Sequence, residues 1–84
     1  MMRVTSVRLV PARSSNSMLG WISCGVAGLR LDGLALRRTR RGRLAVSFPC
    51  HRDRNGRKHP IVRPTGPALE RAILSALRRR GLLP

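Results

Sequence analysis

The sequence predicts an α+β fold, in which a mainly antiparallel β-sheet of four to five strands is followed by one C-terminal amphipathic helix. Three observations lead to this class. Residues 3–10 and 18–26 have the composition and alternation of strands, short turn-type segments separate the later strands, and the apolar period becomes helical near the C-terminus. Because the chain has only 84 residues, we expect one domain over residues 1–84, with strands at about 3–64 and the helix at about 67–80.

The first strand is expected at residues 3–10, where the apolar Val7 and Leu9 alternate with polar side chains. Such alternation is typical of a strand with one buried face. The Ser/Asn-rich segment that follows, residues 12–17, is too polar to pack and is expected to form a loop.

The second strand, residues 18–26, has apolar side chains on both faces. One face is expected to carry Leu19, Trp21 and Ser23, and the other carries Gly20, Ile22, Cys24 and Val26. Two apolar faces indicate either a central strand or a face that a partner chain covers. We therefore expect Trp21 in the core or, together with Leu19, at a dimer interface.

The next apolar segment contains a turn-type dipeptide. Ala27-Gly28 marks a break, after which leucines flank Asp32-Gly33 on both sides. Asp-Gly favours a tight hairpin, but a glycine can also form a bulge inside one long strand. We expect a bulged or bent strand, because each flank is short.

Residues 44–64 are predicted to form a β-arch, which is two strands joined by a cationic loop. The first strand covers residues 44–48 and ends at Pro49, which has no N–H to donate to a neighbouring strand. Asn55-Gly56, at the centre of the loop, is a strong hairpin-turn signal. An extended run is expected to resume at residues 60–62.

The last segment has the period of a helix. Its apolar stripe consists of Leu69, Ala72, Ile73, Ala76 and Leu77. Pro67 suits the first helical position, with Gly66 or Thr65 as the cap. At the other end, Gly81 is expected to stop the helix and Leu82 to fold back on its last turn.

Charge is the outlying property of this chain. Eighteen Lys and Arg residues stand against three Asp and Glu, which gives a net charge of +15. A polyanion would relieve this imbalance, so nucleic acid is the first candidate partner and an anionic membrane surface the second. The arginine excess has a second explanation, because a GC-rich genome also favours arginine on protein surfaces. The candidate nucleic-acid contacts are Arg38, Arg40, Arg41, Arg52, Arg54, Arg57, Lys58, Arg71 and Arg78.

These residues favour phosphate-dominated binding with modest sequence preference, because arginine suits bidentate phosphate contacts. The two arginine-rich connections are expected at opposite ends of the strand between them. Base stacking on the sheet is not expected, because no row of exposed aromatic residues is present, although Trp21 is one candidate platform. We find no internal repeat.

The composition argues against several other functions. Three scattered carboxylates leave no pair for acid/base hydrolysis, and no glycine-rich phosphate loop follows a strand. The spacing of Cys24, Cys50, His51 and His59 does not fit a zinc site. We therefore expect a non-enzyme without metal or cofactor. No apolar run suits a membrane span or a secretory signal, so we expect a cytoplasmic protein with reduced thiols.

Several short segments occur in a recognisable order along the whole chain. They are VTSVRL at 4–9, LDG at 31–33, GRLAVSFP at 42–49, DRNG at 53–56, HPI at 59–61 and the predicted helix at 67–80. Together they make the chain similar to the stage V sporulation protein G (SpoVG) family, also called septation regulators. Each segment alone is weak, but their co-occurrence is specific.

The resemblance implies a SpoVG-like α+β domain that forms a homodimer in the bacterial cytoplasm. It also implies a DNA-binding, and in some members RNA-binding, regulator of septation, sporulation and gene expression without enzymatic activity. The basic residue at Arg52 and the turn at Asp53–Gly56 match the family's loop. The alternative is a protein–protein adaptor of the septation and sporulation network, which would bind through a sheet edge or the Leu19/Trp21 face.

Overall fold

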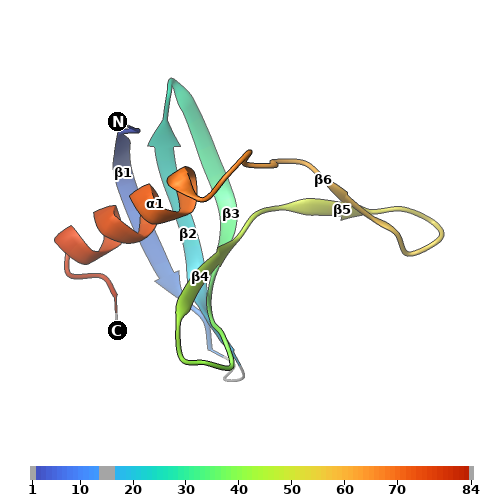
Figure 1. The fold of residues 1–84 in the computed structure, drawn as a ribbon, viewed down its shortest axis with the longest axis horizontal. Helices are drawn as coiled ribbons and strands as arrows, with labels where there is room; N and C mark the ends of the chain where they lie inside the picture. The colour runs from blue at the N-terminus through green and yellow to red at the C-terminus, as the bar shows by residue number, and fades with distance from the viewer. Residues whose placement is uncertain (1, 14–16, 84) are drawn as a thin grey trace.

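The computed structural model describes residues 2–13 and 17–83, and it confirms the α+β class. An antiparallel sheet has the strand order β1-β2-β3-β4, a separate antiparallel hairpin is formed by β5 and β6, and one helix follows (Figure 1). In chain order the elements are β1 (Val4–Pro11), β2 (Met18–Val26), β3 (Leu29–Arg38), β4 (Leu44–Ser47), β5 (Cys50–Arg52), β6 (Lys58–Pro60) and α1 (Ala68–Arg79).

The core lies between α1 and one face of the four-stranded sheet (Figure 1). Its buried apolar residues are Val7, Ile22, Cys24, Leu34, Leu36, Val46, Ile73, Ala76 and Leu77. The helix contributes the last three of these, so the predicted apolar stripe of α1 is its core face. Burial of one Leu or Ile side chain contributes about 1.5–3 kcal/mol, which makes this interface the main source of stability.

Bulges shift the strand register at three places. In β3, Asp32 and Gly33 together oppose Ser23, and Gly33 has a φ of 73°, so the predicted bulge is confirmed. A second shift lies in β1 around Ser6, whose φ is 49°. The third shift lies between Met18 and Gly20 at the start of β2.

The third bulge changes which face Leu19 occupies. Because it inserts one residue into β2, Leu19 packs against the buried core, whereas Trp21 lies outside that core and is 49% exposed. The prediction that Leu19 and Trp21 share one face is therefore wrong, as is the alternative that Trp21 is a core residue. The expected loop at 12–17 falls partly outside the described residues.

The helix is close to its predicted bounds. It begins at Ala68 rather than at Pro67, which occupies the N-cap position, and no side chain caps it, so the predicted cap at Thr65 or Gly66 is wrong. The C-terminal end is as expected. Gly81 has a φ of 68°, and the N–H groups of Gly81 and Leu82 donate to the carbonyls of Arg78 and Leu77 at 3.0 and 2.9 Å.

The predicted β-arch over residues 44–64 is wrong in its second half. The chain leaves the main sheet after β4 and forms the β5–β6 hairpin, which projects away from the rest of the molecule (Figure 1). The returning strand is β6, and it pairs with β5 instead of β4. Ile61 and Val62 are not a strand, and their N–H groups donate to the Pro49 carbonyl at 3.0 and 3.4 Å.

Within the described residues, α1 is too short and too polar to cross a membrane.

Candidate nucleic-acid interface

The connection between β3 and β4, which we call tip 1 (residues 38–43), is a tightly hydrogen-bonded turn. The Gly42 N–H donates to the Thr39 carbonyl at 2.9 Å, and the Thr39 N–H donates to the Arg43 carbonyl at 2.7 Å. The Thr39 hydroxyl accepts a further bond from the Arg43 N–H at 3.1 Å. The Arg38 guanidinium donates to the Gly42 carbonyl at 3.1 Å, which leaves Arg40 and Arg41 exposed at the apex.

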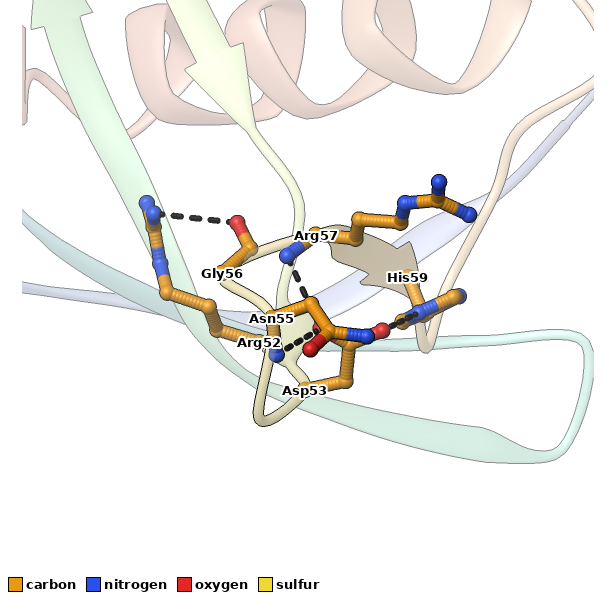
Figure 2. Close-up of polar contacts among 6 residues, drawn as sticks. All are labelled: Arg52, Asp53, Asn55, Gly56, Arg57 and His59. Carbon is orange, nitrogen blue, oxygen red and sulfur yellow. Dashed lines mark hydrogen bonds and ion pairs between the residues drawn. The ribbon is translucent and has the colours of Figure 1, made fainter.

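The connection between β5 and β6, tip 2 (residues 52–57), has the same construction (Figure 2). The Gly56 N–H donates to the Asp53 carbonyl at 3.0 Å, and the Asp53 N–H donates to the Arg57 carbonyl at 2.9 Å. The Asp53 carboxylate accepts from the Arg57 N–H at 2.9 Å, and the Arg52 guanidinium donates to the Gly56 carbonyl at 3.3 Å. Arg54 and Arg57 are exposed.

The two tips are an internal repeat, which corrects the expectation that the chain has none. They share the pattern Arg-(Thr/Asp)-Arg-x-Gly-Arg, and the glycine of each has a φ of 80°. The corresponding residues are Arg38 and Arg52, Thr39 and Asp53, Arg40 and Arg54, Gly42 and Gly56, Arg43 and Arg57. Asn55 does not have a positive φ, so Asn55-Gly56 does not form a two-residue hairpin turn. The turn is the four-residue Asp53–Gly56, at the position that the family resemblance implied.

Asp53 organises tip 2 through three hydrogen bonds. Its carboxylate contacts the His59 ring at 2.8 Å and accepts from the N–H groups of Asn55 and Arg57, both at 2.9 Å (Figure 2). The hydrogen bond to His59, and then the backbone bonds, hold the pKa of Asp53 below its ordinary value. The carboxylate is therefore charged at neutral pH and holds the turn in place.

The helix supplies a separate basic surface, which we call the helix groove. It is a groove of about 1160 Å³ between the start of β1 and the exposed side of α1. Its charged lining consists of Arg3, Arg71, Arg79 and Arg80. Arg71 and Arg79 were expected among the helix contacts, but Arg3 and Arg80 were not, because only the packing of α1 against β1 brings these residues together. Arg78 is exposed on the same helix but does not line the groove.

The predicted contact residues do not form one patch. Tip 1 and tip 2 lie at different ends of the molecule, as expected, and the β5–β6 hairpin projects away from both the sheet and α1 (Figure 1). Arg71 therefore belongs to the helix groove and not to either tip. Lys58 pairs with Arg52 across the hairpin, so it belongs to the base of tip 2.

Few of the cationic side chains are neutralised by acidic side chains of the same chain. Among the described residues, the one arginine in an ion pair is Arg30, which contacts Asp32 at 3.3 Å on the surface. The other two acidic side chains serve the fold, since Asp53 holds tip 2 and Glu70 accepts a backbone hydrogen bond from Val46. The arginines of the tips and groove are thus available to an external anion.

Cysteine and histidine do not converge on a metal site in the part of the chain that the structure describes. Cys24 is buried and Cys50 is exposed, and both are free thiols. His51 and His59 lie opposite each other on β5 and β6.

Neither a family model nor a curated protein matches this chain significantly, so its resemblance to the SpoVG family stays a prediction.

Proposed function

We propose that this protein is a small basic nucleic-acid-binding regulator that contacts DNA, and also RNA, mainly through phosphates. The observation that carries the proposal is the repeated tip. Two turns of the same construction present arginines on a backbone that local hydrogen bonds already hold. A preorganised arginine loses less conformational freedom on binding than one on a mobile loop.

The charge balance supports phosphates as the chemical target. The net charge is +15, and the guanidinium groups of Arg40, Arg41, Arg54 and Arg57 lie at exposed turns. Arginine forms bidentate contacts with phosphate oxygens. About six such contacts to duplex DNA would give a slope of log K against log salt near −5.

The SpoVG resemblance supplies the setting of this proposal. It implies a homodimer in the bacterial cytoplasm that regulates gene expression, septation or sporulation. Free thiols are consistent with a reducing compartment. A two-fold axis would duplicate tip 1, tip 2 and the helix groove, and so increase affinity for a long polyanion.

The test is a titration of duplex DNA and of RNA at several salt concentrations. Arg54→Gln/Arg57→Gln should weaken binding and make the salt slope less negative by about two, because each lost phosphate contact changes it by about 0.9. The matched control is Arg30→Gln/Arg63→Gln, which removes the same charge outside the tips. If neither nucleic acid binds in dilute buffer, or if the slope is near zero, the proposal is overturned.

The second candidate is the protein–protein adaptor. It is favoured by the exposed apolar residues Val10 and Leu29, which are 62% and 65% exposed at the surface of the sheet. A partner bound there would leave affinity insensitive to Arg54→Gln/Arg57→Gln, which separates the two candidates.

A further inference from the structure

The face of the four-stranded sheet that α1 does not cover carries an aromatic ring at its centre. The cross-strand row runs from Val10 through Trp21 and Ala35 to Ser47. Trp21 lies on the interior strand β2 and is 49% exposed, while its neighbours Ala35 and Ser47 are small. The indole ring is therefore open to a planar ligand, and it is not covered by any described residue of the main core.

Two arginines lie on the same face on opposite sides of this ring. Arg8 is two residues from Val10 on β1, and Arg37 is two residues from Ala35 on β3, where the pairing with β4 is regular. Both are exposed. Diagonal neighbours on one sheet face lie about 7–8 Å apart, which is within reach of long side chains. Trp21 is thus flanked by one cation on each side.

Among the described residues, the carboxylate on this face is Asp32, which opposes Ser23 on β2 and is already engaged. Asp32 pairs with Arg30 near the β2–β3 turn, Asp53 holds tip 2, and Glu70 lies on α1. A second copy docked face to face would bring further arginines against Arg8 and Arg37, with only Asp32, which Arg30 already pairs, to neutralise them. The charge pattern instead suits a ligand that offers a flat apolar ring between anions, which is the chemistry of a nucleotide chain.

We propose, as an extension of the proposed function, that this open face binds unpaired nucleobases by stacking on Trp21, with the adjacent phosphates held by Arg8 and Arg37. Bases are free to stack on a protein ring only in single strands, loops or bulges. The face therefore selects single-stranded nucleic acid, whereas the tips contact phosphates of single and double strands alike. Stacking is tolerant of base identity because every base has a π-face.

The experiment uses Trp21 as its own probe, because it is the single tryptophan and the chain has no tyrosine. The ligands are oligo(dT) and an abasic oligonucleotide of the same length, which carries the same phosphates without bases. We expect oligo(dT) to quench Trp21 emission and to bind about tenfold more tightly than the abasic strand. The abasic strand should bind with a salt-dependent affinity and without that quenching.

The variant Trp21→Leu should bind both oligonucleotides equally, at the affinity of the abasic strand, while Trp21→Phe should keep part of the preference. Thermal unfolding checks that each variant folds, and Val10→Ser is the matched control on the same row. Equal binding of the two oligonucleotides by the unmodified protein would overturn the stacking site but leave the proposed function intact. If neither oligonucleotide binds, both proposals fail.

Self-association distinguishes the remaining alternative. If Trp21→Leu converts a dimer into a monomer in sedimentation, and Trp21 emission changes with protein concentration in the absence of nucleic acid, the face is a dimer interface and the stacking proposal is wrong. A sedimentation coefficient unchanged by Trp21→Leu is the result expected here.

Discussion

The Glu70 carboxylate accepts a hydrogen bond of 2.7 Å from the backbone N–H of Val46, and so ties the first turn of α1 to the edge strand β4. Val46 is itself a buried core residue. The bond joins two segments that are far apart in the sequence, and it occupies a backbone donor that would otherwise face outward from the last strand of the sheet.

Removal of this acceptor should destabilise the domain. Glu70→Ala leaves the Val46 N–H unsatisfied beside the core, and we expect a loss of about 1–3 kcal/mol in the free energy of unfolding. Glu70→Gln keeps a neutral acceptor and should cost less. Urea unfolding measures both, with Ser75→Ala on the exposed side of α1 as a control within about 0.5 kcal/mol of the unmodified protein. A Glu70→Ala variant as stable as that control would show that the bond contributes nothing.

The stability of the turn in tip 2 should depend on pH, whereas that of the turn in tip 1 should not. The pKa of Asp53 is lowered in the folded protein by its hydrogen bonds to His59 and to the backbone. The stabilisation of the tip is therefore complete above the ordinary Asp pKa of 3.8 and is lost as the pH falls through the lower folded value.

The measurement is amide NMR between pH 6 and pH 2. The Asn55 and Arg57 amides, which donate to the Asp53 carboxylate, should shift and lose protection together. The Arg43 amide is the internal control, because it donates to the Thr39 hydroxyl, which does not titrate in this range. A parallel shift of Arg43 would mean that acid acts on the whole domain and not on Asp53.

Gly42 should be more sensitive to substitution than an exposed glycine without a positive φ, such as Gly66. Its φ of 80° lies in the left-handed region, and a Cβ there would meet no other atom, so the cost of Gly42→Ala is conformational. We expect a loss of about 1–2 kcal/mol in the free energy of unfolding.

Gly66→Ala is the matched control for this change, because Gly66 also has open space around it but no positive φ. It should be neutral or slightly stabilising, since alanine restricts the unfolded chain. Equal costs at Gly42 and Gly66 in urea unfolding would rule out backbone strain as the cause.

The two cysteines should differ sharply in reactivity. Burial raises the pKa of the Cys24 thiol, whereas Cys50 is exposed on β5. Because the thiolate is the reactive form, a disulfide reagent such as DTNB should modify one thiol quickly in the native protein and the second one only on unfolding. Cys50→Ser should abolish the fast phase, and a fast phase that survives this change would place Cys24 at the surface.

The candidate interface was only partly predictable from the sequence. Charge density and turn signals were enough to identify Arg40, Arg41, Arg54 and Arg57, which the structure places at exposed turns. The repeated pattern Arg-(Thr/Asp)-Arg-x-Gly-Arg was visible in the sequence and could have revealed that the tips are alike. The locking of Arg38 and Arg52 onto glycine carbonyls was not visible, because it depends on the path of a long side chain across a folded turn.

Elements with a local signal could be predicted from the sequence alone. The helical period sets the core face of α1, the Gly81 position sets its end, and Asp32-Gly33 marks the bulge of β3. Features that depend on strand pairing and on packing could not be predicted in this way. The β5–β6 hairpin was missed because both of its strands are exposed and carry no apolar alternation.

The same limit applies to the two faces of β2. A single inserted residue at the start of the strand sends Leu19 to the core and leaves Trp21 on the open face, because side chains in a strand alternate and a shift of one residue reverses the face. The sequence pattern can place an aromatic residue on a strand. The register of the strand pairing then decides whether its side chain is buried or exposed to a ligand.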